Sequence, residues 1–320
     1  MLLKAVTYVQ NALQKSDIIK KLIWEVGKIK IGLIDVDGHN FPNLALMKIS
    51  AYHKSKGDTV DWCNRIEKYD IVYKSKVFDF TPDDATIIQA DVVMQGGTGY
   101  DLKNKLSLDI ESVCPDYNLY SYHKEAYGFL TRGCPRGCEF CIVGEKEGLK
   151  STQVADLGQF WKGQKEIKLL DPNLIACNDW KRLLQQLIDS KSWIDFTQGL
   201  DIRLMTDEKA HMLNQIKAKM IHFAWDNYEF KTYEQLKRFR PLIDLNFRRL
   251  RVYVLTNFNT THEQDLERVY KLREMDYDPY VMIYDKYNAP QKTRHLARYV
   301  NNKRIFRLVD KFDEYDPKLG

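Results

Sequence analysis

The segment AYGFLTRGCPRGCEFC (residues 126–141) joins a predicted β-strand to a loop that holds three cysteines. They are Cys134, Cys138 and Cys141, spaced C-x3-C-x2-C directly after the strand. Three thiolates on one short loop can bind three irons of a cubane cluster, whereas clusters that only transfer electrons normally have four cysteine ligands. The fourth iron then keeps an open coordination position, as the metal of a catalytic zinc site does. The spacing therefore predicts a [4Fe–4S] cluster that can bind a further molecule.

The other cysteines do not form a second cluster in the sequence. Cys63, Cys114 and Cys177 are scattered along the chain, which has six cysteines in all. No signal peptide is evident, so we expect a cytoplasmic protein, in which thiols stay reduced and clustered cysteines indicate metal binding. A structural zinc loop completed by His123 or Cys177 is the alternative, although zinc motifs more often have two pairs of ligands well apart in sequence.

Strands and helices alternate regularly from residue 126 onwards. Six strands are predicted, at residues 126–131, 166–170, 193–197, 221–225, 251–256 and 279–284. Helices are predicted between them, at residues 153–161, 179–190, 206–218, 233–239 and 262–275. Six β-then-α units indicate a partial (β/α)6 barrel of the TIM type, with an open doubly wound sheet as the alternative. In either fold the active site is expected at the carboxyl ends of the strands.

A smaller domain is predicted in front of the barrel. Strands at residues 28–38, 59–62, 69–78 and 91–94, with a one-sided helix at 43–56, give βαβ units and a parallel, Rossmann-like sheet. The fold class is therefore α/β throughout. We divide the chain into a helical extension (1–27), the Rossmann-like domain (28–122), the partial barrel (123–290) and a C-terminal helix and tail (291–320).

The motif C-x3-C-x-aromatic-C, at the end of the first strand of an alternating β/α domain, resembles the signature of the radical S-adenosylmethionine (SAM) superfamily. With the domain in front, the chain resembles members that carry an N-terminal cobalamin-binding-type domain. The resemblance implies that SAM chelates the open iron and is cleaved by one electron to methionine and a 5′-deoxyadenosyl radical. It also implies an external reductant of the flavodoxin or ferredoxin type, and it places Phe140 beside the adenine of SAM.

The resemblance indicates further cofactor-binding residues after the next three barrel strands. Asp171, in the segment Leu-Asp-Pro-Asn, is the candidate for the amino group of SAM, with capping of the following turn as the alternative. Arg203 is the candidate for the methionine carboxylate, because a guanidinium grips a carboxylate with two parallel hydrogen bonds. A surface salt bridge is its alternative role. Gln198 and Asp201 are expected to face the same end of the barrel as Arg203, and Asp226 is the candidate to bond the ribose hydroxyls.

The front domain carries a candidate cobalamin loop. Cobalamin-binding domains of one type use an Asp-x-His-x-x-Gly loop, in which the histidine ligates cobalt and the aspartate orients it. Asp37 and His39 match this pattern, and Gly96 and Gly97 resemble the later glycine pair, but Pro42 replaces the loop glycine. The domain is also short. We therefore expect a reduced domain that shapes the substrate cavity, with a cobalamin-dependent radical SAM methyltransferase as the alternative.

Charge and hydropathy argue against several other classes of protein. A net charge of +5 is mild for 320 residues, and apolar residues interrupt the most basic segment, 238–251, so a nucleic-acid partner is not indicated. No apolar run approaches the ~20 residues that cross a bilayer, and no membrane association is expected. A non-catalytic zinc or iron–sulfur protein that binds nucleic acid is the alternative outside the enzymes. The substrate stays undetermined, because the superfamily acts on peptides, nucleic acids, lipids and small metabolites.

Overall fold

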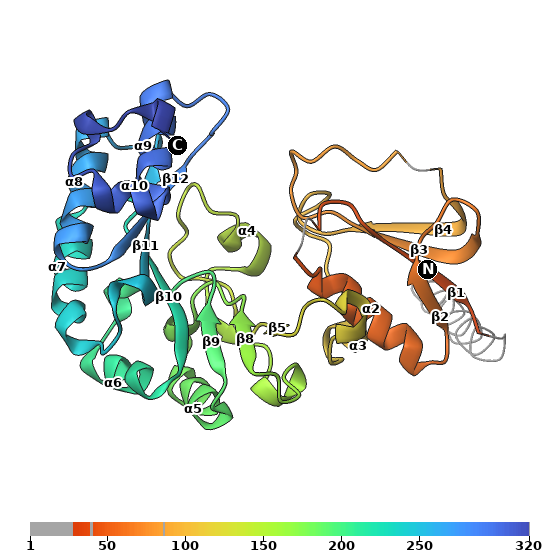
Figure 1. Cartoon of the computed structure of the whole chain (residues 1–320). Helices are drawn as coiled ribbons and strands as arrows, with labels where there is room; N and C mark the ends of the chain where they lie inside the picture. Colours follow the sequence, from red (N-terminus) through yellow and green to blue (C-terminus); the bar gives the residue numbers. More distant parts are fainter. Residues whose placement is uncertain (1–27, 39–40, 86, 320) are drawn as a thin grey trace, which may run out of the picture. The chain divides into compact units, whose positions relative to one another are not determined.

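The computed structural model describes residues 28–38, 41–85 and 87–319 (Figure 1). The chain forms two compact units, residues 1–119 and 120–320, and each is described by itself. The division falls close to the boundary predicted at residue 122. The helix predicted within residues 1–27 lies outside the described residues.

The first unit is built on a four-stranded parallel sheet. β1 (Lys30–Asp35) lies between β2 (Thr59–Trp62) and β3 (Lys68–Ser75), and β4 (Gln89–Gly96) follows β3, which gives the order β2-β1-β3-β4. A short helix, α3 (Leu108–Glu111), comes after the sheet. The strand order changes direction between β1 and β3, and ligands of such sheets bind beyond the carboxyl ends of the strands at this point. The predicted Rossmann-like sheet is confirmed.

Helix α2 (Leu44–Ser55) packs against this sheet. It begins where the side chain of Asn43 accepts a hydrogen bond from the Leu46 amide (3.2 Å), which satisfies one of the free N–H groups of the first turn. Leu46 then packs with Ile31 and Leu33 of β1 in a core from which water is excluded. The helix therefore fixes the position of β1 and of the loop that follows it.

The second unit is a six-stranded sheet in which every neighbouring pair is parallel. Its strands are β5 (Ala126–Gly128), β8 (Glu166–Leu169), β9 (Trp193–Phe196), β10 (Ala218–Ala224), β11 (Leu250–Thr256) and β12 (Asp278–Ile283). The strands lie side by side in the order of the sequence, as in a β/α barrel, whereas a doubly wound sheet reverses its order at a switch point. The partial barrel is confirmed, and the doubly wound alternative does not apply to this unit.

Helices cover one side of this sheet, and the loop that carries α4 lies on the other (Figure 1). The covering helices include α5 (Trp180–Ser190), α6 (Asp207–Gln215), α7 (Phe230–Phe239) and α8 (His262–Glu274). The other helices of this unit are α4 (Val143–Glu147), α9 (Gln291–Asn301) and α10 (Lys303–Leu308). α8 begins with a capping box, in which Thr261 and Gln264 each bond the backbone amide of the other. None of the described helices is long and apolar enough to span a membrane.

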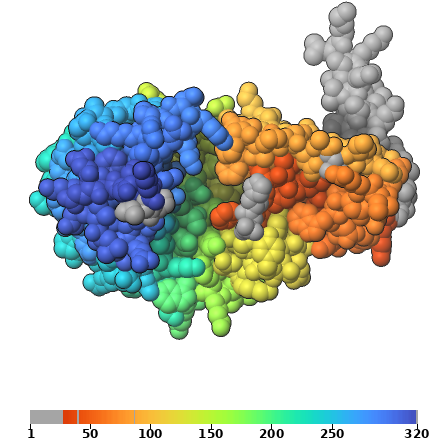
Figure 2. All heavy atoms as spheres, turned by 45° about the horizontal axis from the view of Figure 1, so that its top comes forward, coloured from red at the N-terminus to blue at the C-terminus, as the bar shows by residue number. Residues whose placement is uncertain are grey.

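The C-terminal elements belong to the second unit and do not form a separate part. α9 packs against β12, and Asn301 bonds the Val281 amide (2.8 Å) and carbonyl (2.9 Å) through its side chain. Figure 2 shows α9, α10 and the tail on the surface of this unit, in dark blue. Residues 291–319 therefore extend the barrel on the side of its last strand.

Two sequence predictions in the barrel are wrong. Residues 153–161 do not form a helix: Thr152–Gln153 (β7) pair with Thr131–Arg132 (β6), and only a 3-10 turn follows, at Leu157–Gln159. The predicted strand 126–131 ends at Gly128, because the amides of the residues after it bond a side chain and not a neighbouring strand.

Candidate functional site

The cysteine loop begins at the carboxyl end of β5, the first strand of the barrel sheet. The β6–β7 pair closes its base, and the Cys134 amide donates to the Gly148 carbonyl (3.1 Å). Gly133 has a φ of 86°, and a side-chain carbon there would overlap the carbonyl oxygen of Lys150. Only glycine fits such a position. The loop is therefore held in one shape by its own backbone.

The three predicted ligand cysteines share this loop and are free thiols. Cys134 and Cys138 are half-buried and Cys141 is exposed, and Cys141 donates its amide to the Cys138 carbonyl (3.0 Å). Burial raises the pKa of the Cys138 thiol, and the nearby Asp226 carboxylate raises it further. No three His, Cys, Asp or Glu side chains converge as ligands of one ion within the described ranges. Ligands of a cubane each bind a different iron and stand farther apart than ligands of one ion. Their role as cluster ligands stays a prediction.

Asp171 holds the backbone that leads into the cysteine loop. Its carboxylate is buried and accepts hydrogen bonds from the amides of Leu130 (3.1 Å) and Thr131 (2.5 Å) and from the Thr131 hydroxyl (2.7 Å). Burial raises the pKa of Asp171 to about 6, although these donors favour the charged form. Asp171 thus stabilises the backbone at Leu130 and Thr131, which is neither of the two roles considered from the sequence. Binding of an amino group by Asp171 stays a prediction.

Asn173, two residues further on, is the residue of this segment that faces the cysteines. Its Nδ2 donates to the Cys134 sulfur (3.5 Å), and its Oδ1 is buried without a partner among the described residues. Hydrogen bonds to ligand sulfurs tune iron–sulfur clusters. An acceptor left without a donor at this point fits a ligand that brings an N–H group. Sequence analysis missed Asn173, although it lies in the same Asp-Pro-Asn segment.

Asp201 joins two arginines from different loops. Its Oδ1 accepts from the amide (3.1 Å) and Nε (2.8 Å) of Arg203, and Arg136 of the cysteine loop donates to Oδ2. Burial acts to raise the pKa of Asp201, but the two guanidinium groups outweigh it and lower the pKa below its usual range. Asp201 thus ties the cysteine loop to the loop after β9. Neither terminal nitrogen of Arg203 bonds any residue that the structure describes, so both are available to a carboxylate.

Gln198 is exposed and its side chain makes no hydrogen bond within the described part of the chain. It stands one residue before Gly199, whose positive φ of 101° turns the chain after β9. No contact within the described part of the chain connects Gln198 with the cysteines, and its role as a cofactor contact stays a prediction.

Asp226 follows β10 and lies near both Cys138 and Arg203. Burial raises its pKa to about 6, against the pull of Arg268 and Arg203. Arg268 is fully buried, and its Nη1 donates to the carbonyls of Trp225 and Asp226 (2.9 Å to the latter). Asp226 is therefore held on a backbone that Arg268 fixes, and its carboxylate has no hydrogen-bond partner among the described side chains.

The ring of Phe140 belongs to a cluster of aromatic rings that come from three different loops. Its ring centroid lies 5.4 Å from that of Phe258, at an interplanar angle of 74°, and Phe258 lies 5.0 Å from Tyr284. Phe258 follows β11 and Tyr284 follows β12. The rings therefore meet at the carboxyl edge of the sheet, where a planar base can pack against them. Phe258 was not predicted from the sequence.

Of the candidate cobalamin residues, Asp37, Gly96 and Gly97 lie at the carboxyl edge of the first sheet. The buried Asp37 carboxylate accepts from the Val77 amide (2.9 and 3.0 Å) and the Phe78 amide (2.7 Å). A side-chain carbon at Gly97 would overlap the Lys76 carbonyl oxygen, whereas one at Gly96 would meet nothing within 4 Å. Asp37 thus stabilises the backbone that follows β3, and Gly97 allows a close backbone contact with Lys76. His39 lies outside the described residues.

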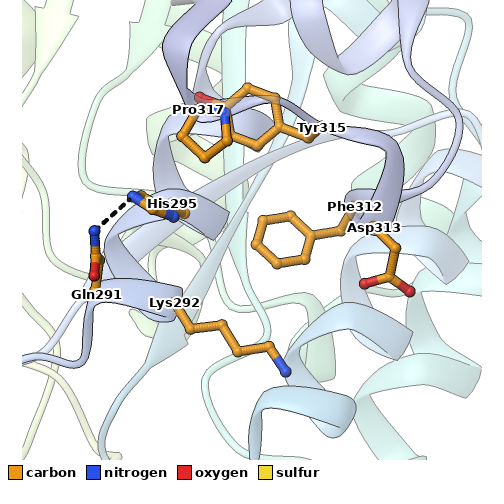
Figure 3. A pocket seen from close by; sticks show the side chains of 7 residues that line it. All are labelled: Gln291, Lys292, His295, Phe312, Asp313, Tyr315 and Pro317. Atoms are coloured by element: carbon orange, nitrogen blue, oxygen red, sulfur yellow. Dashed lines mark hydrogen bonds between the residues drawn. The ribbon is translucent and has the colours of Figure 1, made fainter.

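A cavity of about 360 Å³ lies elsewhere in the second unit, between α9 and the tail (Figure 3). Its lining residues are Gln291, Lys292, His295, Phe312, Asp313, Tyr315 and Pro317. Gln291 and His295 bond one another across one side of it (3.5 Å). None of the lining residues is a predicted site residue, and we give the cavity no part in the proposed reaction.

No protein-family model matches the sequence, and no curated protein matches it either. Two solved structures of the radical S-adenosylmethionine methyltransferase TsrM from Kitasatospora setae are similar to this chain. The one with cobalamin and a [4Fe–4S] cluster bound has a TM-score of 0.60 at 10% identity, covering 80% of this chain and 75% of that one. The one with tryptophan substrate and the SAM analogue aza-SAM bound has a TM-score of 0.58 at 11% identity, covering 80% and 73%. At such identities the likeness shows the fold, a Rossmann-like unit followed by a partial TIM-type barrel, as in radical SAM enzymes.

Proposed function

We propose that this chain is a radical SAM enzyme that holds a [4Fe–4S] cluster on Cys134, Cys138 and Cys141. The observation that carries the proposal is the place of the cysteine loop, at the carboxyl end of the first strand of a six-stranded β/α barrel sheet. When bound, the cluster supplies one electron, taken from a flavodoxin- or ferredoxin-type protein, that cleaves SAM to methionine and a 5′-deoxyadenosyl radical able to remove a hydrogen atom from the substrate.

The residues around the loop fit SAM group by group. Asn173 offers its unpartnered Oδ1 to the amino group, beside Cys134. Arg203 offers its two terminal nitrogens to the carboxylate, while Asp201 fixes the guanidinium through Nε. Asp226 accepts from the ribose hydroxyls, and the Phe140 ring packs against the adenine.

The first test is anaerobic reconstitution, reduction with dithionite in the presence of SAM, and measurement of iron and 5′-deoxyadenosine. About four irons per chain and formation of 5′-deoxyadenosine are expected. Cys138→Ala should abolish both, and Cys63→Ala, in the first unit, should leave both unchanged. Iron without product would support the cluster and count against SAM cleavage. Zinc in place of iron would refute the proposal and favour the non-catalytic binding protein.

A cobalamin-dependent methyltransferase is the second candidate, since TsrM, whose structure holds cobalamin, is similar over most of this chain. The Asp37 carboxylate accepts from two amides and keeps lone pairs that could accept from a histidine N–H. Hydroxocobalamin that stays with the chain through gel filtration, and is lost in His39→Ala, would favour this function. Passage of all the cobalamin in the small-molecule fraction would exclude it.

A further inference from the structure

The side of the barrel sheet that the helices leave uncovered carries a row of polar and aromatic side chains. On the covered side the strands present apolar residues such as Ile167, Ile194 and Val252, all fully buried. The residues between them point the other way. In the strand register Lys168 stands opposite Tyr127 on one side and Asp195 on the other, and Tyr253 stands opposite Tyr280. His222 stands opposite Arg251, one step nearer the amino ends of the strands than Tyr253. We call this set the inner row: Tyr127, Lys168, Asp195, His222, Tyr253 and Tyr280.

The inner row is continuous across the sheet. Lys168 donates to the Tyr127 hydroxyl (3.1 Å), and the ring of His222 stacks on Tyr253 with centroids 5.1 Å apart and an interplanar angle of 9°. Tyr253 in turn meets the edge of Tyr280 at 5.9 Å. On the same face, towards the carboxyl ends, Ala224 and Met282 are exposed. The carboxyl end of this face, where the cysteine loop begins, is therefore open to solvent.

Two acceptors in the inner row lack donors. Oδ1 of Asp195 is buried and has no hydrogen-bond partner among the described residues; the nearest ring nitrogen, Nδ1 of His222, lies 3.9 Å away, beyond hydrogen-bond reach. Burial lowers the pKa of His222 to about 4, so the ring is neutral at pH 7. Its Nδ1 lies 3.0 Å from the Phe196 carbonyl, which can only accept, so the proton is on Nδ1 and Nε2 is an acceptor.

The cations near the inner row are, by contrast, already paired. Lys168 forms an ion pair with Glu125 (3.1 Å), and Lys219 pairs with Glu166. Arg251 pairs with Asp278 (3.0 Å), which also pairs with Lys303 (2.7 Å). Lys168 is itself a member of the row, and Arg251 stands opposite His222 in the strand register, but each has its charge satisfied by a carboxylate partner. The row therefore needs a donor of hydrogen bonds and has no free cation for an anionic ligand.

We propose that the inner row binds the substrate through a primary ammonium group, which donates to Asp195 and His222 and packs against the ring of Tyr253. A cation is attracted to the face of an aromatic ring and to a buried carboxylate alike, and both are present here. This assignment rests on the proposed function, since it names the substrate class of the same site. The ammonium group can belong to a small amine or to a lysine side chain of a peptide.

Isothermal titration calorimetry on the reconstituted full chain with SAM tests the assignment with three probes. Phenethylamine represents a small amine, Nα-acetyl-lysine amide represents a peptide lysine, and 3-phenylpropionate is the matched carboxylate. At least one amine is expected to bind and the carboxylate is expected not to; the tighter of the two amines identifies the source. Binding of the carboxylate as tightly as the amines, or binding of neither amine, would overturn the assignment.

Asp195→Asn keeps the shape of the side chain and removes its charge, and it should weaken amine binding by about tenfold or more. Asp244→Asn, at an exposed carboxylate, is the matched control and should bind as the unchanged chain does. Equal binding by both variants would refute the role of Asp195. Formation of 5′-deoxyadenosine is measured in the same preparations. SAM cleavage without amine binding defeats only this assignment, whereas amine binding without SAM cleavage defeats the proposed function.

Discussion

Replacing Gly133 by alanine is expected to open the cysteine loop. The φ of 86° at Gly133 costs an alanine about 1–2 kcal/mol, because its Cβ crowds the backbone in the left-handed region. The new Cβ would also stand less than 3.0 Å from the Lys150 carbonyl oxygen, which real Cβ atoms essentially never show. Overpacking of this kind adds about 1–3 kcal/mol. The expected loss of stability is therefore roughly 2–5 kcal/mol.

Gly148 supplies a matched control in the same loop. Its backbone (φ 95°, ψ 168°) is also unfavourable for alanine, but a Cβ there would meet nothing within 4 Å. Gly148→Ala should therefore lose only the backbone cost of about 1–3 kcal/mol, less than Gly133→Ala. Urea unfolding followed by tryptophan fluorescence measures both variants, because four of the six tryptophans lie in the second unit. These are Trp161, Trp180, Trp193 and Trp225.

Iron retention after reconstitution gives the second readout. Gly133→Ala should bind less iron than the unchanged chain, since the backbone must move away from Lys150 and carry Cys134 with it. Gly148→Ala should retain its iron. Equal losses of stability in the two variants, or a greater loss in Gly148→Ala, would show that the contact with Lys150 does not fix the loop.

Three further predictions concern the buried charges of the second unit. Arg268→Met leaves Asp265 buried without its ion pair (2.5 Å) and should lower the free energy of unfolding in urea by about 3–5 kcal/mol. The double variant Arg268→Met, Asp265→Leu should recover part of this loss, and no recovery would contradict the reasoning. Burial holds the pKa of Asp226 at about 6. The protonated Asp226 therefore stabilises the fold fully below about pH 4, and this stabilisation is lost as the pH rises through about 6. Between these two values the stability of Asp226→Asn should rise relative to that of the unchanged chain. Parallel curves of stability against pH would refute this. Asp171→Asn turns an amide N–H towards the Leu130 amide and should cost about 1–3 kcal/mol by the same measurement, while a neutral effect would show that this bond is dispensable.

The sequence by itself determined the local features of this protein. The C-x3-C-x2-C spacing, the alternation of strands with helices and the start of α8 near Thr261 are set by residues close together in the chain. Periodicity and capping act over one or two turns or strands, so they are visible without a structure. The same local rules failed at residues 153–161, where Gln153 pairs with β6 and Gly158 stands inside the expected helix.

Only the tertiary structure decided which polar groups meet. Arg136 and Asp201 stand 65 positions apart in sequence, and Asp171 bonds an amide 41 positions before it. Asp171 and Asn173 occupy one short segment, yet one turns into the backbone and the other faces Cys134. Such pairings follow from strand register and from the burial of each side chain, which depend on the whole sheet. A sequence pattern records the spacing of residues along the chain, whereas the chemistry of a site depends on their distances across it.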